Sequence, residues 1–339
     1  MERLKKSTND FKKVAFVGFW KNFKVDTSPF VKFIQDRFEL EITDVEHADY
    51  VFYSVFSQEH WLVPDRCIKI FYTGEMITPD FNACDYAIGF DWLEYGDRFF
   101  RLPFYYRLPN INELMEEKHK QPLEEVLSKK TDFCSITISN TNRHPVFKQL
   151  YEIISLYKKV DSGGGWNNNI GKRVNDKLSF DLTHKFSIVC ENCSHPGYTT
   201  EKLVQAFAAN CIPIYWGDPE VTKVFNPKAF IEVKDLTSLD EVIERVKMID
   251  NDDNLYKRMI KEPVYLDACL SKEVVINKFE NYLSYIFNQP IDMAKRRNRV
   301  FWGDRYIKEK RIMYRWACPY RIVQKTVNKI KKNIIADTK

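Results

Sequence analysis

The stretch FSIVCENCSHPGYTTEKLVQAFAANCIPIYWGDP, residues 186–219, determines the fold class. Its first apolar run ends at Glu191, a polar loop follows, and a helical pattern begins near Thr200. The run IPIYWG (212–217) then has the short, β-branched character of a buried strand. Strand, helix and strand in this order predict a parallel β-α-β unit.

The same alternation recurs in two series along the chain. The first series has strand patterns at 13–20, 49–56, 68–73 and 85–90, and a helical pattern at 29–38. A charged, helix-prone stretch at 112–130 separates it from the second series. The second series has strand patterns at 132–139, 184–192 and 212–217, and helical patterns at 146–159, 199–211, 238–250 and 272–288. We expect an α/β fold of two doubly wound, Rossmann-like domains facing across a cleft, with one large α/β domain as the alternative.

Length and charge divide the chain further. A sequence of 339 residues that is 44% hydrophobic can fill two cores, which we expect at 1–125 and 126–290, before a tail at 291–339. From Lys295 to Lys339 there are 15 Lys/Arg and 3 Asp/Glu, whereas the rest holds 37 basic and 44 acidic residues. An acidic body argues against nucleic acid as a partner, and a basic tail favours anionic lipid.

The chain starts with MERLKKSTNDFKK, which is too polar for a signal peptide. No apolar run approaches the roughly 20 residues that span a bilayer, so we expect a cytoplasmic protein with reduced cysteines. Cys190 and Cys193 form a CxxC. No second pair of cysteines or histidines stands nearby at ligand spacing, so we expect no metal site.

Polar residues gather where the strand of 186–219 gives way to its helix. The N–H groups of a helix start bind anions such as a diphosphate, and Lys202 in the first turn can reach a phosphate oxygen. Glu201 can accept hydrogen bonds from a ribose diol, and Tyr198 can stack or hydrogen-bond. Thr199 and Thr200, which precede Glu201, are candidate N-cap residues. The alternative is an ordinary helix start with a solvated lysine.

Two other segments suit a substrate site. Glu75 follows the strand pattern IKIFYT and Gly74, where partial burial would make its carboxylate a general base; an exposed loop glutamate is the alternative. The loop SGGGWNNNIGKRVNDK (162–177) has three glycines that permit a close approach of backbone to a nucleotide. That loop matches neither a P-loop nor GxGxxG.

Several of these segments together resemble the α1,3-fucosyltransferase family. ENCSHPGYTTEKLVQAFAANCIPIYWGDP, followed by FNPKAF (225–230), is similar to the family's donor-binding signature. FYTGE (71–75), FNACDYAIGFD (81–91) and RLPFYY (101–106) resemble blocks in the first domain of its bacterial members, and YKKVDSGGGWNNNIG (157–171) resembles a further block. The resemblance runs, with gaps, from Phe71 to Pro263.

The resemblance implies a GT-B fold with an N-terminal acceptor domain, a C-terminal GDP-fucose domain and inversion at the anomeric carbon. By the same resemblance, Glu75 is the general base and Glu201 binds the ribose hydroxyls. Lys202 binds the diphosphate, and Asn192 and Tyr198 line the donor pocket. No cofactor is required, and a divalent metal is expected at most to stimulate the reaction.

One position departs from the family pattern. The family commonly has an arginine in the helix after the motif SN, where this chain has Phe147. We expect Arg143, in the preceding loop, to contact the diphosphate instead, because a loop arginine can still bind phosphate with two N–H groups. The departure also leaves room for reduced activity or another donor.

The tail carries an apolar stripe at 3,4,3,4 spacing, made by Tyr320, Val323, Val327, Ile330 and Ile334. With its lysines and arginines it predicts a basic amphipathic helix that binds an anionic membrane surface near a glycan or glycolipid acceptor. The protein would then lie at the inner face of the cytoplasmic membrane. The alternatives are packing on the protein's own body or on the second copy in a homodimer.

The reaction we expect is the inverting transfer of fucose from GDP-fucose to an acceptor glycan, at the 3-OH of GlcNAc in lactosamine-type chains. One alternative is a relative that uses another nucleotide sugar. A second is a non-enzymatic, peripheral membrane-binding protein, against which Glu75 and the cluster from Tyr198 to Lys202 argue.

Overall fold

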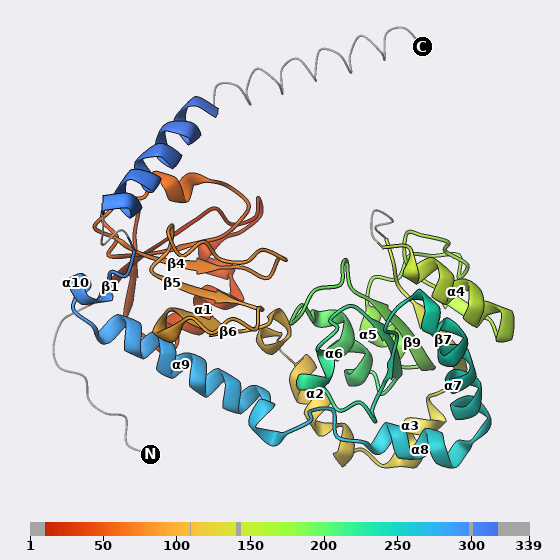
Figure 1. Cartoon of the computed structure of the whole chain (residues 1–339). Helices are drawn as coiled ribbons and strands as arrows, with labels where there is room; N and C mark the ends of the chain where they lie inside the picture. The colour runs from red at the N-terminus through yellow and green to blue at the C-terminus, as the bar shows by residue number, and fades with distance from the viewer. Residues whose placement is uncertain (1–10, 109, 140–143, 298–300, 318–339) are drawn as a thin grey trace, which may run out of the picture. The chain divides into compact units, whose positions relative to one another are not determined.

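The computed structural model of the chain describes residues 11–108, 110–139, 144–297 and 301–317 (Figure 1). They form two compact units, each with its own sheet. The first unit comprises the chain up to Gly89, Glu94–Phe100 and the chain from Glu280 onward; the second comprises Phe90–Leu93 and Arg101–Phe279. Two α/β units confirm the predicted fold class and exclude a single large domain.

The first unit has a six-stranded sheet. Its order is β2 (Leu40–Ile42), β1 (Lys12–Val17), β3 (Tyr50–Tyr53), β4 (Ile68–Tyr72), β5 (Tyr86–Gly89) and β6 (Phe99–Arg101). Strands β1 to β5 are parallel. Strands β2 and β3 lie on opposite sides of β1, so the topological switch point, where such sheets bind ligands, lies between β1 and β3.

Helices α1 (Pro29–Gln35) and α9 (Lys272–Asn288) pack on this sheet. Phe30 of α1 contacts Phe52, and Phe287 near the end of α9 contacts Tyr50. The remaining helical elements of this unit are η1 (Val25–Thr27), η2 (Glu59–Trp61), η3 (Gly96–Arg98), α10 (Ile291–Ala294) and a helix at 301–317.

The C-terminal part of the chain is fixed to the first unit by a buried ion pair. The guanidinium of Arg297 bonds to Asp85 at the start of β5, and both side chains are fully buried. Burial also lowers the pKa of Arg297 to about 10. Arg311 binds Asp65 at 2.7 Å. Residues 280–317 therefore belong to the first unit, and the expected boundary at residue 290 is not a boundary in the fold.

The expected boundary at residue 125 is also displaced, because the chain already joins the second unit at Arg101. This joining segment contains η4 (Phe104–Arg107), α2 (Ile111–Glu117), η5 (Lys118–Lys120) and α3 (Leu123–Ser128). The helix-prone stretch 112–130 is divided at Pro122, which precedes α3 as its N-cap residue.

The second unit has a five-stranded, wholly parallel sheet. Its order is β11 (Ile231–Glu232), β10 (Ile212–Trp216), β9 (His184–Cys190), β7 (Asp132–Ile136) and β8 (Val160–Ser162). Since β7 is its first strand, the topology repeats that of the first unit, and the switch point lies between β7 and β9.

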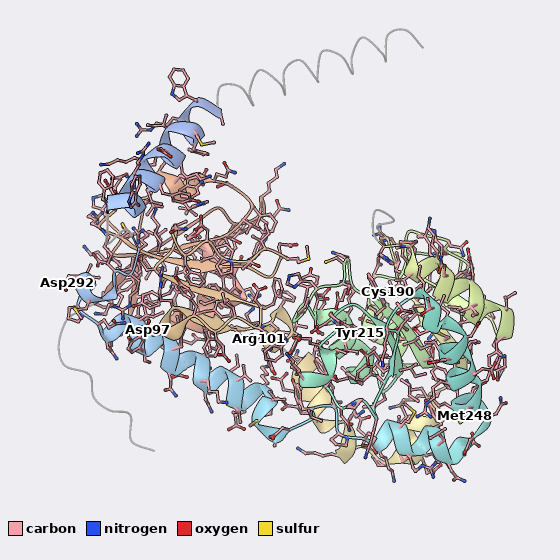
Figure 2. The ribbon with its side chains drawn as sticks, in the orientation of Figure 1. Asp97, Arg101, Cys190, Tyr215, Met248 and Asp292 are labelled. Atoms are coloured by element: carbon pink, nitrogen blue, oxygen red, sulfur yellow. The ribbon has the colours of Figure 1, made fainter. Side chains whose placement is uncertain are left out.

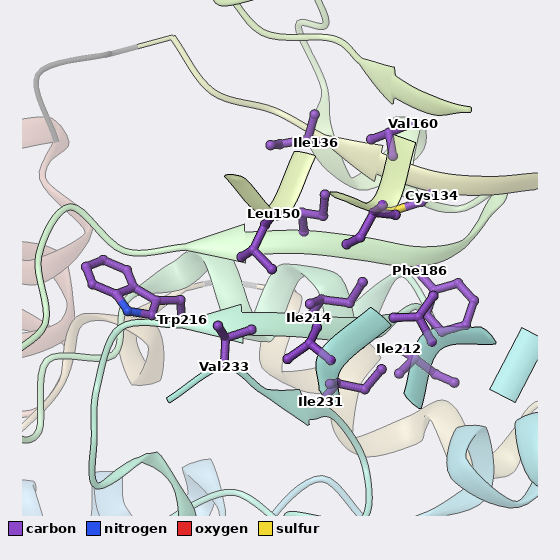
Figure 3. Packing of buried hydrophobic residues seen from close by; sticks show 14 of the residues in the cluster. Cys134, Ile136, Leu150, Val160, Phe186, Ile212, Ile214, Trp216, Ile231 and Val233 are labelled. Carbon is purple, nitrogen blue, oxygen red and sulfur yellow. The ribbon is translucent and has the colours of Figure 1, made fainter. Parts of the chain in front are cut away.

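Helices cover both faces of the second sheet. Helices α4 (Val146–Tyr157), α7 (Leu239–Asn251) and α8 (Asp253–Lys261) bury the apolar core that Figure 3 shows around Ile136, Leu150 and Ile214. Helix α6 (Glu201–Ala208) contacts β9 and β10 and packs with α2 and α5 (Lys177–Asp181). The remaining 3-10 turns of this unit are η6 (Val221–Lys223), η7 (Leu236–Ser238) and η8 (Ala268–Leu270).

One predicted strand is shorter in the structure, and one predicted helix lies outside the described residues. The strand predicted at 13–20 ends at Val17, because Gly18 takes a φ of +68° that ends the extended backbone. The amphipathic helix predicted after Pro319 lies outside the described residues. Within the described ranges, none of the helices has the length and apolar character needed to cross a membrane.

Candidate functional site

A buried carboxylate holds the turn between β9 and α6. Glu191, the first residue after β9, is fully buried. It accepts hydrogen bonds from the backbone N–H of Thr200 at 2.8 Å, the hydroxyl of Thr200 at 2.7 Å and Nζ of Lys202 at 2.7 Å. Gly217 allows this approach, since a Cβ there would lie 2.4 Å from Cγ of Glu191.

This carboxylate changes the expected helix start. Thr200 is the N-cap residue of α6, but its hydroxyl bonds to Glu191 and makes no side-chain capping bond. The protein thus places its own anion at the positive end of the helix. The first four N–H groups of a helix have no acceptor within it, and here Glu191 accepts the one of Thr200.

Lys202 is held in place rather than freely solvated. Its side chain is 23% exposed, and Nζ contacts Thr200 Oγ1 at 3.2 Å in addition to the 2.7 Å ion pair with Glu191. An ammonium group has three N–H donors, so these two bonds leave one for a ligand oxygen. The alternative of an ordinary solvated lysine does not fit this geometry.

A second buried carboxylate fixes the start of the same turn. Asp218 follows β10 and accepts hydrogen bonds from the N–H of Gly197 at 2.8 Å and the hydroxyl of Thr199 at 3.0 Å. Its own N–H donates to the hydroxyl of Tyr215 at 3.1 Å, and burial raises the pKa of Tyr215 well above its usual value. Tyr215 and Cys190, labelled in Figure 2, belong to the neighbouring strands β10 and β9.

Gly197 is required at the turn for two reasons. Its φ is +81°, and a Cβ there would lie 2.7 Å from the carbonyl oxygen of Phe90. Its carbonyl accepts a bond from Arg101 at 3.3 Å, and this guanidinium lies 3.7 Å from the ring of Trp92. The motifs RLPFYY and FNACDYAIGFD, expected in the first domain, therefore both contribute residues that support the turn of the second unit.

The structure brings four predicted donor residues to the carboxyl edge of the second sheet. Glu201 begins α6 and is partly exposed beside Lys202, and Asn192 is exposed directly after Glu191. Tyr198 differs from the others, since it is buried with its ring 5.0 Å from that of Phe90.

The glycine-rich loop packs against the chain that leaves β7, on the other side of the switch point. A Cβ on Gly164 would lie 2.0 Å from the carbonyl oxygen of Ile138, so glycine is required there. The exposed Arg173 of this loop donates to Ser139 Oγ at 3.0 Å. Arg143, the predicted diphosphate ligand, lies outside the described residues.

Sequence reasoning missed three residues of this edge. Arg173 is a cation whose only sequence signal was its place in the loop GKRVNDK. Glu191 and Asp218 had a clearer signal, because each is a carboxylate within two residues of the end of a buried strand. In parallel sheets such positions converge on the ligand-binding edge.

A pocket of about 330 Å³ opens where β11 ends, at the start of α7. Glu232, Lys234 and Arg245 are among its lining residues. Burial, more than any neighbouring charge, raises the pKa of Glu232. The carboxyl edge of this sheet thus offers both anionic and cationic groups to a polar ligand.

Glu75 lies at the corresponding edge of the first sheet, after β4. Its N–H donates to the hydroxyl of Thr73 at 2.9 Å, and its carbonyl accepts from the N–H of Ile77 at 2.8 Å. Its side chain is exposed, so the expected partial burial is absent. These bonds order the backbone of the turn and leave the carboxylate open to solvent.

The part of the chain that the structure describes contains no group of three or more His, Cys, Asp and Glu residues arranged to hold a metal ion. Cys190 is buried at the end of β9, and Cys193 is partly exposed in the turn. Neither cysteine forms a disulfide, and burial raises the pKa of Cys193.

Comparison with known proteins agrees with this architecture. Residues 14–108 match the description "Alpha-(1,3)-fucosyltransferase FucT N-terminal domain", and residues 127–262 match "Glycosyltransferase family 10 (fucosyltransferase) C-term". An α-(1,3)-fucosyltransferase FucT from Helicobacter pylori is 32% identical over 286 residues, which cover 74% of this chain and 59% of that protein.

Solved structures give the same result. A crystal structure of an α1,3-fucosyltransferase with GDP-fucose is 28% identical, with a TM-score of 0.68, and the match covers 84% of this chain and 93% of that one. HepE from Anabaena in complex with UDP and glucose has a TM-score of 0.50 at 8% identity, which shows a shared fold alone.

Two doubly wound units of this kind define the GT-B class of glycosyltransferases. Within that class, the chain belongs to glycosyltransferase family 10, the α1,3-fucosyltransferases. It spans about 59% of the length of the Helicobacter pylori relative.

We predict that Glu191→Ala destabilises the second unit by about 3 kcal/mol, because it leaves the N–H of Thr200 and the ammonium of Lys202 without their acceptor. Urea denaturation followed by circular dichroism would measure the change. Glu244→Ala is the matched control, since its ion pair with Lys247 lies on the surface of α7 and is worth at most about 1 kcal/mol. Equal midpoints for the two variants would contradict the role given to Glu191.

Proposed function

We propose that the protein transfers fucose from GDP-fucose to a hydroxyl of an acceptor glycan, with inversion at the anomeric carbon. One observation carries the proposal: the buried Glu191 fixes Lys202 at the start of α6, beside the partly exposed Glu201. A cation and a carboxylate held side by side at a switch point match the needs of a nucleoside diphosphate, which presents an anion and a ribose diol.

In this proposal the second unit binds the donor. Lys202 contacts the diphosphate together with the N–H groups at the start of α6, and Glu201 accepts hydrogen bonds from the ribose hydroxyls. Asn192 lines the site, and Tyr198 supports it from beneath by packing on Phe90. These contacts stabilise the charge that develops on GDP as it leaves.

Arg143 remains our proposal for a further diphosphate ligand, and Arg173 is a second candidate. Arg173 lies on the glycine-rich loop, at the β7 side of the switch point, and donates a hydrogen bond to Ser139. An arginine can bind a phosphate with two parallel N–H groups, which suits either residue to this task.

The first unit supplies the base. The acceptor hydroxyl oxygen attacks the anomeric carbon, the bond from that carbon to the diphosphate oxygen breaks, and the hydroxyl proton moves to the carboxylate of Glu75. GDP leaves with the bonding electron pair. Such a displacement needs a single base, and we assign this role to Glu75, whose carboxylate is exposed to an incoming acceptor.

We propose the 3-OH of GlcNAc in lactosamine-type glycans as the acceptor. The support is the similarity to proteins named α1,3-fucosyltransferases. A reaction with another nucleotide sugar on the same scaffold is the alternative, because the cluster at α6 recognises a diphosphate and a ribose, which all nucleoside diphosphate sugars share. The scheme needs no metal ion, although a divalent cation near the diphosphate would be compatible with it.

Incubation of the full chain with GDP-fucose and N-acetyllactosamine, followed by mass spectrometry, tests the reaction. We predict a product heavier by one deoxyhexose residue. We further predict that Glu75→Gln lowers kcat at least ~100-fold, the usual size of a general-base contribution, while the Kd of GDP is unchanged.

Glu94→Gln is the control for that substitution, since Glu94 is another exposed carboxylate of the first unit. Its kcat should equal that of the unsubstituted protein. A near-normal kcat for Glu75→Gln would remove Glu75 from the mechanism. Product formation from a UDP sugar but not from GDP-fucose would favour the alternative donor.

We also propose that the C-terminal segment binds an anionic membrane surface and holds the enzyme at the inner face of the cytoplasmic membrane. The support is the basic excess after Lys295 and the exposed aromatic residues of the helix 301–317, namely Phe301, Trp302 and Trp316. Association with a second copy through this segment is the competing proposal.

Replacing Lys325, Lys329, Lys331 and Lys332 by glutamate tests the membrane proposal. Each basic residue near an anionic surface contributes about 1 kcal/mol, so the variant should lose sedimentation with anionic liposomes and keep its activity on a soluble acceptor. Unchanged sedimentation, or a change from dimer to monomer without any liposome binding, would contradict it.

A further inference from the structure

The first sheet carries a group of aromatic side chains at its own switch point. Strand β1 ends in Gly18-Phe19-Trp20, and β3 continues into Val55-Phe56. The side chains of Trp20 and Phe56 are 45% and 50% exposed. Two half-exposed rings side by side at a ligand-binding edge are not explained by core packing.

The two rings are held against each other by the backbone of both strands. The N–H of Ser54 donates to the carbonyl of Val17 at 3.1 Å, and the N–H of Phe56 donates to the carbonyl of Gly18 at 2.9 Å. The ring centroids of Trp20 and Phe56 are 6.1 Å apart in an edge-to-face arrangement.

Packing against Phe23 supports Trp20 in this position. The ring of Phe23 lies 4.9 Å from Trp20 and 4.2 Å from Phe19. Since Phe23 is only partly exposed and stacks on Phe19, the indole rests on a packed aromatic layer. The platform formed by Trp20 and Phe56 is therefore rigid before any ligand binds, which lowers the entropy cost of binding.

The same aromatic layer leads to the strand that carries Glu75. The ring of Phe19 lies 6.0 Å from that of Trp20 and 6.0 Å from that of Tyr72, the last residue of β4. Glu75 follows Tyr72 by three residues. The platform and the carboxylate thus lie at the carboxyl edge of one sheet, on the adjacent strands β1, β3 and β4.

We infer that Trp20 and Phe56 form the acceptor-sugar subsite, which stacks the apolar C–H face of a pyranose ring; this inference rests on the proposed transfer reaction. A pyranose has one face of C–H groups and a rim of hydroxyls. The face packs on aromatic rings, whose π-systems attract the polarised C–H groups. Asn22, exposed beside Trp20, supplies amide donors and an acceptor to the rim hydroxyls.

The chemistry of the edge favours a neutral sugar over the other ligands of the reaction. A diphosphate needs cations or a helix N-terminus, and the second unit provides both in Lys202 and α6. The platform itself consists of apolar rings, and the carboxylate of Glu75 on the same edge can accept a hydroxyl proton; the exposed Lys21 and Lys24 are the cations of this segment. The two switch points of the chain are thus suited to different substrates.

Steady-state kinetics with N-acetyllactosamine as acceptor and GDP-fucose as donor test the inference. Trp20→Ala and Phe56→Ala should each raise the acceptor KM at least tenfold and leave the donor KM and the Kd of GDP unchanged. Trp20→Phe keeps a ring and should restore most of the acceptor affinity. Trp302→Ala, which removes another exposed tryptophan of the first unit, should leave the acceptor KM unchanged.

A second measurement covers variants that fail to fold. Titration of the acceptor into the GDP-bound protein should change tryptophan fluorescence, and Trp20→Phe should abolish that change. Acceptor KM values within twofold of normal for both alanine variants, or an unaltered fluorescence response in Trp20→Phe, would overturn the subsite. Either result with normal product formation leaves the proposed reaction intact, whereas no product from the unsubstituted protein counts against the reaction itself.

Discussion

The second unit depends on one buried interaction, in which the carboxylate of Glu191 accepts three hydrogen bonds from the turn that starts α6. Burying a charge is costly unless it is paired and fully bonded, and here Lys202 pairs it and Thr200 completes the bonding. The arrangement explains why position 217 must be glycine and why Lys202 lies where a ligand can reach it. Glu191 therefore holds Thr200 and Lys202 in place at the start of α6.

We propose that both units use the same topology for different ligands. In each sheet the second and third strands along the chain lie on opposite sides of the first strand, so each sheet has a switch point at its carboxyl edge. In the second unit this edge carries a helix start, Lys202 and Glu201, which suit a charged nucleotide. In the first unit it carries Trp20, Phe56 and Glu75, which suit a neutral sugar that must lose a proton. The membership of the chain in family 10 accords with this division, because a glycosyltransferase has one substrate of each kind.

Much of the fold could be predicted from local pattern, and the exceptions have physical causes. Strands β3, β4 and β9 are wholly or mostly buried, so their sequences are mainly apolar, with Lys69 in β4 and His184, Lys185 and Ser187 in β9 as exceptions. Glu201 and Lys202 could be found because a helix start is visible in sequence. The return of the chain to the first unit could not, since it depends on Arg297 meeting Asp85 more than two hundred residues away. Likewise, the sequence pattern places Trp20 in a strand, whereas the strand ends at Val17 because Gly18 has a positive φ.

We propose that the turn fixed by Glu191 presents Lys202 to a guanosine diphosphate. Isothermal titration of GDP and UDP into the full chain and into Lys202→Ala tests it most directly. We expect GDP to bind the unsubstituted protein more tightly than UDP does. We also expect Lys202→Ala to weaken GDP binding at least tenfold without lowering the melting temperature below that of Glu191→Ala. Unchanged GDP affinity in Lys202→Ala would contradict it.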